Sequence, residues 1–316
     1  MNVGKGISII DAMDLGIEKR TGCYVLHAEE LTIVETSASP SIPYLLEGFK
    51  KIGIDPKEIK NIIVTHIHLD HAGGVGLLLE SCPNAKVVVH PRGMRHLADP
   101  SKLILGARAV YGEKFDELFD PILPVPENRL LVKEDGDTLQ IGENRVLTFW
   151  DTPGHAKHHF SIHDSMSNGI FTGDTIGVFY PQLFEKGLEL YLPSTSPNQF
   201  DPDAMLNSLE KIKALDVERI YFGHYGMSAN PHHVFEQIKK WLPIFMESGE
   251  KVWEEAQSDS LEDKSEALFK KLFAIIHSYL LEKNIALDEE MTEIIQLDLR
   301  VGSMGIIDYL AKKQNR

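Results

Sequence analysis

Four metal-capable side chains occupy six consecutive positions between an apolar run and a pair of glycines. They stand in "IIVTHIHLDHAGGVG", residues 62–76, and are His66, His68, Asp70 and His71. In an extended chain the side chains at i and i+2 point the same way, so the first two imidazoles can face one ion. The other two follow where the chain turns into a helix, and can face a second ion. The spacing therefore predicts a metal site rather than a polar loop with incidental histidines.

Three further strand ends carry candidate ligands, and all three show the same sequence pattern. Each apolar run ends in a glycine that is followed at once by a potential ligand, and glycine permits both a turn and a close backbone approach. The pairs are Gly154–His155, Gly173–Asp174 and Gly223–His224. Imidazole suits zinc, iron, nickel or copper, while aspartate can bridge two ions. We therefore expect these strand ends to converge with the first motif on one site of five histidines and two aspartates.

Alternating strand and helix patterns position these motifs up to about residue 230. Helical patterns lie at 43–54, 73–83, 91–120 and 199–215, and the last opens with Asp201-Pro202 as an N-cap and first helical residue. Short β-branched runs predict the strands, and the second and third are typical of a hairpin. These strands are expected within residues 7–11, 22–28, 31–37, 58–66, 85–90, 137–142, 145–155, 159–164, 169–174 and 217–226.

The remaining residues, 231–316, show no strand pattern and predict about three helices. One apolar row consists of Leu268, Leu272, Ile275 and Tyr279, and such a face needs a partner. We expect a domain over residues 1–230 with a helical extension over 231–316 packed on it. The extension could also contribute to a homodimer.

Composition and charge limit the classes of function. The 316 residues are 43% hydrophobic and 25% charged, as in ordinary globular proteins, and the formal net charge is −15. An acidic chain repels phosphate backbones, which argues against a nucleic-acid partner. Cys23 and Cys82 are far apart and form no CxxC pair, which is typical of a reducing compartment. With no signal-peptide pattern and no long apolar run, we expect a soluble cytoplasmic protein that binds a small molecule and no membrane.

Taken together, the motifs resemble those of the metallo-β-lactamase fold superfamily over roughly residues 7–230. "TPGHAKHHFSI" is similar to the "PGHxxHHxSF" version of a group of uncharacterised family hydrolases. The resemblance implies an α+β fold, a four-layer αββα sandwich, here with a C-terminal helical extension. It rests on the HxHxDH motif as His66-Ile-His68-Leu-Asp70-His71, followed in the usual order by His155 in "TPGH", Asp174 in "TGD" and His224 in "GH".

The same resemblance implies two divalent metal ions and a hydrolytic function. It assigns His66, His68 and His155 to the first ion, Asp70, His71 and His224 to the second, and Asp174 to a bridge between them. Zinc is the default, and iron or manganese would also satisfy a His/Asp set. Two such ions lower the pKa of a bridging water toward about 7 and yield hydroxide at neutral pH. The implied enzyme is a dinuclear metallo-hydrolase of a carboxylic ester, lactone or thioester.

Two other functions stay open. A mononuclear iron oxidoreductase of the persulfide dioxygenase type would use only the first-ion triad, and the presence of a second set of ligands argues against it. A phosphodiesterase or nuclease is disfavoured by the negative charge. Lactonases of the superfamily usually carry a tyrosine three residues past the bridging aspartate, where this chain has Gly177.

The segment from Ile176 to Phe200 is aromatic, contains one lysine and shows no strong periodicity, and ordered loops of that length are usually functional. We expect it to form a pocket wall, with Tyr180 or Tyr191 donating to a developing oxyanion. Packing on the C-terminal helices is the alternative. These tyrosines and Asp70 are the catalytic candidates. Glu35 is expected to cap a turn rather than to orient an imidazole.

Overall fold

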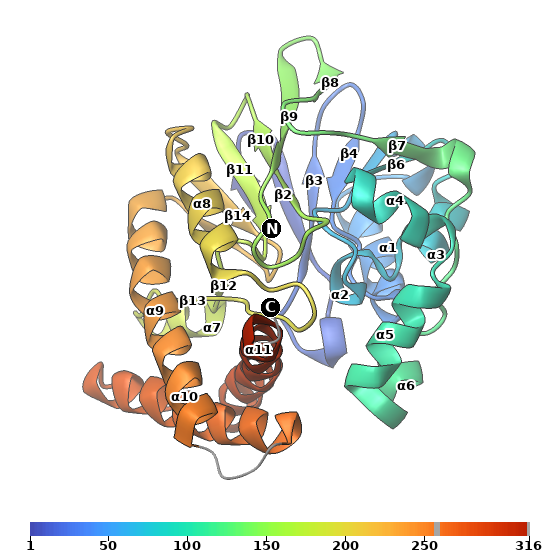
Figure 1. Cartoon of the computed structure of the whole chain (residues 1–316). Coiled ribbons are helices and arrows are strands. Elements are labelled where there is room, and N and C mark those ends of the chain that lie inside the picture. The colour runs from blue at the N-terminus through green and yellow to red at the C-terminus, as the bar shows by residue number, and fades with distance from the viewer. Residues whose placement is uncertain (256–259, 315–316) are drawn as a thin grey trace. The chain divides into compact units, whose positions relative to one another are not determined.

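The computed structural model describes residues 1–255 and 260–314 of the chain (Figure 1). The chain divides into two compact units, each discontinuous in sequence. The first comprises Met1–Asp151, His158–Gly173 and Asp216–Pro231, and the second comprises Thr152–Lys157, Asp174–Leu215 and His232–Arg316. The predicted boundary at residue 230 between a domain and an extension stays a prediction.

The first unit contains a seven-stranded sheet in the order β1-β2-β3-β4-β5-β6-β7. Strands β1 to β4 pair antiparallel, and β4 to β7 pair parallel. The antiparallel β3–β4 pair confirms the predicted hairpin. After the polar first residues Thr32, Asn61 and Lys86, the strands β4 to β6 are short, buried apolar runs, because a parallel strand inside a sheet is covered on both faces. The strands span Asn2–Gly4, Ile7–Asp11, Gly22–Leu26, Thr32–Val34, Asn61–Ile63, Lys86–Val89 and Leu130–Val132.

A second, six-stranded sheet of the same unit runs in the order β15-β14-β11-β10-β9-β8. Strands β11 and β14 are parallel neighbours, and the other pairs are antiparallel. The carboxyl ends of β11 and β14 therefore lie at one edge of the sheet. From β8 to β11 the strands span Thr138–Gly142, Arg145–Asp151, Phe160–Asp164 and Gly169–Gly173, and β14 and β15 span Arg219–Phe222 and Met227–Ser228.

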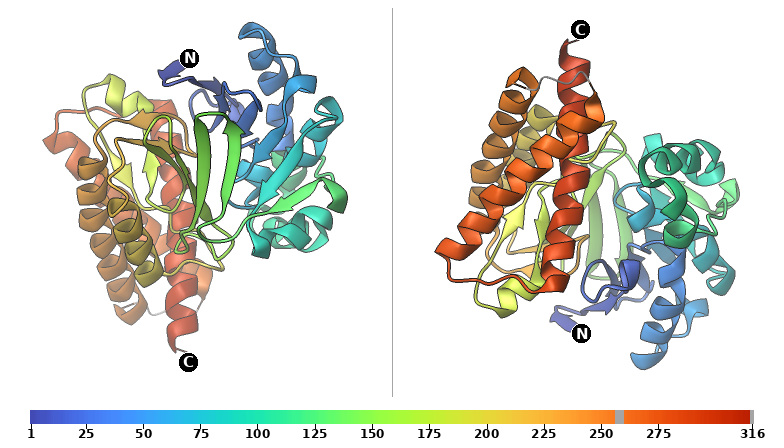
Figure 2. Two further views of the ribbon diagram at one scale, coloured as in Figure 1. Left: turned by 90° about the horizontal axis from the view of Figure 1, so that it is seen from above. Right: turned by 90° about the horizontal axis from the view of Figure 1, so that it is seen from below.

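Side-chain alternation along the strands builds two apolar layers. Ile62 of β5 and Val87 of β6 pack with helices on one face of the seven-stranded sheet, together with Leu45 of α1 and Leu78 of α3. Their neighbours Ile63 and Val88 point the other way and pack with Phe149, Ile162 and Phe171 of the second sheet. The first unit thus contains one helical layer and two packed sheets (Figure 2). The helices are α1 Ile42–Lys51, α2 Leu69–Ala72, α3 Val75–Ser81, α4 Pro91–Ala98, α5 Ser101–Tyr111 and α6 Phe115–Phe119.

The second unit is mainly helical. It contains α7 Pro181–Glu185, α8 Pro202–Lys213, α9 Pro231–Glu255, α10 Leu261–Glu282 and α11 Glu289–Gln314, with a two-stranded ribbon of β12 Val178–Phe179 and β13 Tyr191–Leu192. The three helices predicted beyond residue 231 are confirmed. So is the Asp201 N-cap, whose side chain accepts a hydrogen bond from Ala204 N at 3.0 Å. In the described part of the chain, no helix has the length and apolarity to cross a bilayer.

Three details of the predictions are wrong. Strand β14 is not the last, because β15 follows it and pairs antiparallel with it. The segment 176–200 is not a loop throughout, because it contains β12, α7 and β13. On α10 the buried row continues from Leu272 to Ile276 and Leu280, while Ile275 and Tyr279 are not among its buried residues. A four-residue spacing keeps that row on one helix face.

Candidate metal centre

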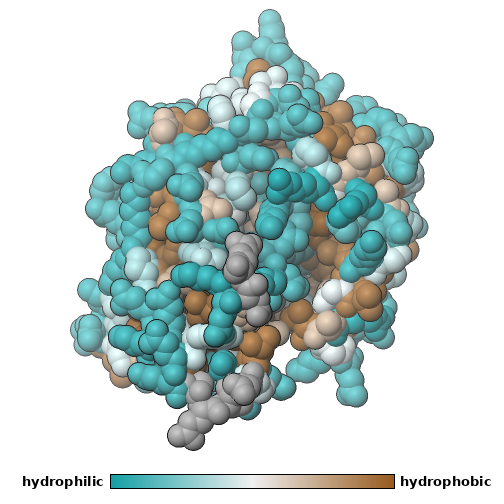
Figure 3. Space-filling view, in the orientation of Figure 1, coloured by the Kyte–Doolittle hydropathy of each residue, from teal (hydrophilic) through white to brown (hydrophobic). Residues whose placement is uncertain are grey.

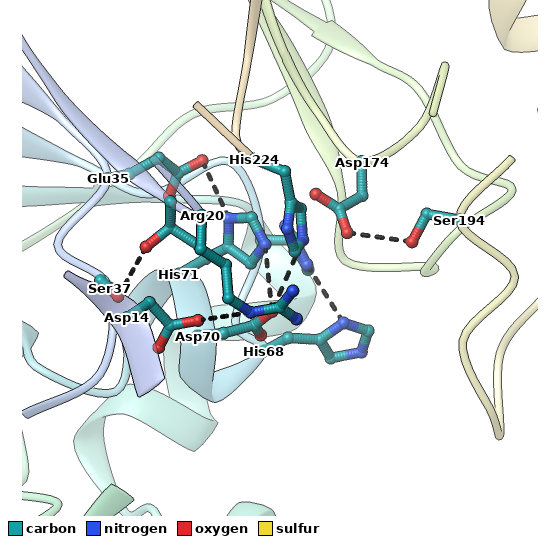
Figure 4. Close-up of polar contacts among 12 residues, drawn as sticks. Asp14, Arg20, Glu35, Ser37, His68, Asp70, His71, Asp174, Ser194 and His224 are labelled. Atoms are coloured by element: carbon teal, nitrogen blue, oxygen red, sulfur yellow. Dashed lines mark hydrogen bonds and ion pairs between the residues drawn. The ribbon is translucent and has the colours of Figure 1, made fainter. Parts of the chain in front are cut away.

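Five of the seven predicted ligands lie in the first unit, at the carboxyl ends of β5 and β14. His66 and His68 follow β5 in extended chain, and the first helical turn of α2 then begins. His66 Nε2 lies 3.1 Å from His68 Nδ1, so both rings face the same point, as the i, i+2 spacing predicts. The other three residues of this unit are Asp70 and His71 on α2 and His224 after β14 (Figure 4).

Asp70, His71 and His224 fit a transition-metal ion. Their donor atoms all lie within 4.8 Å of one another. Asp70 Oδ2 is 3.6 Å from His71 Nε2 and 3.7 Å from His224 Nε2. Two donors bonded at about 2.1 Å to a tetrahedral ion stand about 3.4 Å apart, so these separations need little adjustment. One carboxylate and two imidazoles are also a donor set that suits zinc, iron or manganese.

Glycine provides the close approach that this group needs. The Gly223 N–H donates to Gly173 O at 3.3 Å, which joins the ends of the parallel strands β14 and β11. A Cβ atom at Gly223 would lie 2.6 Å from Cε1 of His71. Any larger residue would therefore displace the imidazole. Two of the three predicted glycine–ligand strand ends thus meet in the first unit.

A carboxylate and a hydroxyl orient two of these imidazoles from behind. The Thr65 hydroxyl donates to Glu35 Oε1 and lies 3.0 Å from His66 Nδ1. Because that hydroxyl proton is used on the carboxylate, its oxygen accepts from His66 Nδ1–H, which leaves the free lone pair of the ring on Nε2. Glu35 Oε1 also lies 3.6 Å from His71 Nδ1. Such partners fix the tautomer and orientation of metal-binding histidines.

The expected turn-capping role of Glu35 is therefore corrected. Its backbone N–H donates to Ile63 O at 2.8 Å, at the end of the β4–β5 pair. This strand pairing places Glu35 directly beside the chain that leads into the histidine motif. The residue is 3% exposed, has φ +70° and serves the imidazoles rather than a turn.

We expect Glu35→Gln to weaken metal binding without unfolding the protein. The amide keeps the acceptor for Thr65 but removes the charge beside His71, and loss of such a partner costs about 10- to 100-fold in metal affinity. Competition with a chromophoric chelator measures the affinity. Glu30→Gln is the matched control, because Glu30 bonds to Asn61 on the same sheet at 3.2 Å and reaches none of the ligands. Equal zinc affinity in both variants and the parent would contradict the orienting role.

A buried ion pair lies beside these ligands, and no spacing pattern in the sequence marks it. Arg20 Nε donates to Asp14 Oδ2 at 3.2 Å, and both side chains are almost fully buried (Figure 4). Burial raises the pKa of the Asp14 carboxyl, the Arg20 guanidinium opposes that rise, and the charge of Asp70 adds to it. The carboxylates of Glu35 and Asp70 alone outweigh one guanidinium. This negative balance favours a divalent cation.

The other two predicted ligands, His155 and Asp174, lie in the second unit. His155 Nε2 is 3.7 Å from Asp174 Oδ2, and each side chain is almost fully buried. The His155 Nδ1–H donates to Ser194 O at 3.0 Å, and the Ser194 hydroxyl donates to Asp174 Oδ2 at 3.0 Å. Figure 4 shows the second of these bonds. Gly154 and Gly173, the residues before these ligands, have φ +138° and +47°, as a turn made by glycine requires.

Several other histidines have structural partners. His90 caps α4, accepting from Arg92 N at 3.1 Å and donating to Asp151 at 2.7 Å. The rings of His158 and His159 pack near the ring of His66, with centroids 6.2 and 5.0 Å away. His158 Nδ1 also accepts from Ile67 N at 3.4 Å. These contacts fit packing around the first motif.

Both candidate tyrosines are buried within the second unit. The Tyr180 hydroxyl donates to Asp298 Oδ2 of α11 at 3.0 Å. Tyr191 stacks on Phe179 with centroids 5.3 Å apart, and its backbone N–H donates to Gln237 of α9 at 3.1 Å. Such contacts are those of packed side chains, and the catalytic role of the two tyrosines stays a prediction.

Comparisons with known proteins agree with the fold. The metallo-beta-lactamase fold-containing protein ST1585 of Sulfurisphaera tokodaii is 25% identical over 242 residues, 75% of this chain and 85% of that protein. Its crystal structure has a TM-score of 0.68 at 20% identity, covering 95% of this chain and 98% of the other. The metallo-beta-lactamase family protein TTHA1429 of Thermus thermophilus also has a TM-score of 0.68, at 18% identity, covering 99% and 95%.

A hydroxyacylglutathione hydrolase of Rhodopseudomonas palustris is 29% identical over 175 residues, and the match covers 54% of this chain and 51% of that enzyme. The α+β metallo-β-lactamase fold with C-terminal helices, predicted above, is confirmed. The family model for the metallo-beta-lactamase superfamily matches residues 20–224. That range is more than half of the chain and contains all seven predicted ligands, so the protein belongs to the metallo-beta-lactamase superfamily.

Proposed function

We propose that this protein is a metal-dependent hydrolase that cleaves an ester-like bond with the help of two divalent ions. The superfamily consists mostly of metal-dependent hydrolases. The observation that carries the proposal is the spacing of Asp70, His71 and His224, whose donor atoms are separated as ligands of one ion would be. In the proposed site one ion is bound by His66, His68 and His155. The second ion is bound by Asp70, His71 and His224, and Asp174 bridges the two.

Chain connectivity supports a single site for all seven ligands. Asp174 directly follows Gly173, so their Cα atoms are about 3.8 Å apart. Gly173 is itself bonded to Gly223, the residue before His224. His155 is four residues past the end of β9 and three before His158. Both ligands of the second unit thus follow strand ends of the first within four positions of sequence.

The protein's own residues would prepare the chemistry in three ways. When bound, the two ions supply an activated water and a Lewis acid. Thr65, Glu35 and the Ser194 carbonyl hold protons or charge at the outer nitrogens of the histidines, so that the inner nitrogens face the ions. The Asp70 side chain is 27% exposed, against 1% for His71 and 7% for His224. Asp70 is therefore the carboxylate that can hold a proton of the attacking water.

The substrate class and the metal are tested in one experiment. The purified protein is stripped, reloaded with zinc, iron or manganese, and assayed on carboxylic esters, lactones, thioesters and phosphodiesters, with the metal-free protein as control. We expect about two equivalents of metal per chain and turnover of an ester, lactone or thioester. A thioester is included in the assay because one relative is named a hydroxyacylglutathione hydrolase, and an acylglutathione is a thioester.

Three results would overturn this proposal. Full activity with one iron ion, together with oxidation of a persulfide, would make the chain an oxidoreductase. Turnover of phosphodiesters alone would make it a phosphodiesterase. Absence of metal-dependent turnover on every arm would reject the hydrolase.

The tyrosine prediction concerns how the substrate oxygen is held. If Tyr180 or Tyr191 donates to the developing oxyanion, its change to phenylalanine should lower kcat/KM by about 100-fold or more. Asp298→Asn is the control for Tyr180, because it disturbs the same hydrogen bond without removing the hydroxyl. Both phenylalanine variants within about threefold of the parent, at unchanged metal content, would leave packing as their only role.

We further propose that the protein works in the cytoplasm and could form a homodimer. The cysteines Cys23 and Cys82 are free and buried, which fits a reducing compartment. Burial raises the pKa of the Cys82 thiol to about 12 and that of Cys23 well above its usual range, so both stay neutral.

On the face drawn in Figure 3, apolar side chains form small groups among hydrophilic ones. Sedimentation analysis decides the oligomeric state.

A further inference from the structure

Ser194 contacts both ligands of the second unit through different polar groups. Its carbonyl oxygen accepts from His155 Nδ1–H and its hydroxyl donates to Asp174 Oδ2, each at 3.0 Å. The first bond places the imidazole proton on Nδ1, so that Nε2 keeps the lone pair for an ion. The second sets the direction of the carboxylate. Because one residue makes both bonds, a displacement of Ser194 changes both ligands together.

The residues that follow Ser194 contact two glycines of α11, Gly302 and Gly305. The Thr195 hydroxyl donates to Gly302 O at 2.8 Å. A Cβ atom at Gly302 would lie 2.9 Å from Thr195 Oγ1, and a Cβ atom at Gly305 would overlap the Thr195 carbonyl oxygen and crowd Ser196 C at 2.6 Å. Only glycine at 305 permits this approach of backbone to backbone. Thr195 is buried in the contact, being 1% exposed.

The contact continues along the same face of α11. Asn198 N donates to Asp308 Oδ2 at 3.2 Å, and Lys312 Nζ donates to Asn198 O at 3.0 Å. Positions 302, 305, 308 and 312 follow one another at intervals of three or four residues, which is the spacing of a single helix face. This face therefore holds the chain from Thr195 to Asn198 along its length.

The other faces of α11 are fixed by its neighbours in the second unit. A Cβ atom at Gly249 of α9 would lie 2.5 Å from Ile306 Cγ2, so α9 and α11 are in close contact. Arg300 lies over the Phe269 ring of α10 at 3.8 Å and also pairs with Glu266. A densely packed interior transmits a displacement instead of absorbing it. With α11 held in this way, a larger residue at position 305 should displace the Thr195 backbone, and with it Ser194, rather than the helix.

We propose that α11 is the element that positions the second unit's metal ligands, acting through Thr195 and Ser194. This inference rests on the proposed function in one respect only, that His155 and Asp174 bind metal. It gives the C-terminal helices a role at the metal centre: the α11 face at Gly302 and Gly305 sets the place of Ser194, and Ser194 sets the ion-binding atoms of both ligands.

The test compares two glycines of the same helical group. Gly305→Ala pushes against the Thr195 backbone, whereas Gly249→Ala pushes against the Ile306 side chain and does not touch the Ser194 segment. Ser194→Ala removes only the hydroxyl, and Ser194→Thr restores one. The full-length proteins are measured for zinc affinity by chelator competition, for the absorption spectrum of the cobalt-substituted form, and for unfolding of the metal-free form in urea.

We expect Gly305→Ala and Ser194→Ala to lose about tenfold or more in zinc affinity and to alter the cobalt spectrum. Ser194→Thr should recover the parent affinity, and Gly249→Ala should lose stability while keeping affinity and spectrum. If Gly305→Ala does not fold, Thr195→Val, which removes the bond to Gly302, takes its place with the same expected loss.

Parent-like affinity and spectrum in both Gly305→Ala and Ser194→Ala, or an equal loss of affinity in Gly249→Ala, would overturn the inference. These measurements need no substrate. A parent that binds zinc but turns over no ester rejects the proposed function alone, and the variants then still decide the role of α11. A parent that binds no zinc rejects both.

Discussion

Replacing Asp174 by alanine should lower kcat/KM by about a thousandfold or more and reduce the bound metal from about two equivalents per chain to one or none. In the proposed site this carboxylate binds both ions, so its removal affects both at once. The stabilisation that an ion gives the transition state amounts to several kcal/mol, and about 4 kcal/mol corresponds to a factor of a thousand. Asp174 is almost fully buried and lies 3.7 Å from His155 Nε2. Elemental analysis and steady-state kinetics on the best ester measure the two effects.

Asp55→Ala is the control for a general loss of stability. The Asp55 side chain caps the short helix η3, Pro56–Glu58, by accepting from Lys57 N at 3.0 Å, and it reaches none of the ligands. Loss of such a cap costs about 1 kcal/mol, so this variant should keep its metal and its turnover. An Asp174→Ala protein that retained about two ions and parent kinetics would reject the dinuclear site.

The candidate ligands could be named from the sequence because short local patterns identify them. His66, His68, Asp70 and His71 are nearly contiguous, and their spacing states which side chains share a face. The glycine before His224 marks a close approach, and the structure shows the reason in the contact with the His71 ring. Such patterns can be recognised in a single sequence because each involves only residues that are close together in the chain.

The residues that orient the ligands could not be found in the same way. Glu35 reaches His71 because β4 pairs with β5, and Ser194 reaches His155 across 39 positions of sequence. Ser194 also uses a backbone carbonyl, which every residue possesses. The buried pair of Asp14 and Arg20 carries no spacing pattern either. Their roles follow from tertiary contacts, and no local sequence pattern distinguishes these residues from other serines, glutamates, aspartates or arginines.

The fold was predictable to a similar degree and for similar reasons. Strands such as β2 and β6 have several β-branched residues and were found, whereas β12, β13 and β15 have two residues each and carry no periodicity. On α10 the apolar pattern predicts the buried Leu268 and Leu272 correctly and Ile275 wrongly. Both i+3 and i+4 spacings fit a helix, and only the packing against neighbours decides between them.

Ending the chain near residue 230 should give insoluble or inactive protein. This deletion removes α9, α10 and α11, and with them the contacts that hold the remaining second-unit segment. Gln237 of α9 accepts a hydrogen bond from Tyr191 N and donates one to Glu189 O. Asp298 of α11 accepts from the Tyr180 hydroxyl. Gly305 of α11 lies directly against the Thr195 backbone. The buried aromatic and aliphatic side chains between Val178 and Leu192 would become exposed. At about 1.5–3 kcal/mol for each large side chain, exposing a few of them costs as much as the roughly 5–15 kcal/mol that stabilises a typical domain.

The experiment separates loss of the helices from the break in the chain. Residues 1–230 are produced alone and also together with a separate chain of residues 231–316, and the soluble yield, metal content and ester turnover of each are compared with the full-length protein. We expect the single fragment to be insoluble, or metal-poor and inactive. The pair should recover part of the activity, because the contact of Thr195 with α11 is then restored. A soluble 1–230 fragment with parent metal content and turnover would show that the helices are dispensable for the site. Recovery of solubility without metal in the paired fragments would instead show that a continuous chain is needed to hold Ser194 against His155 and Asp174.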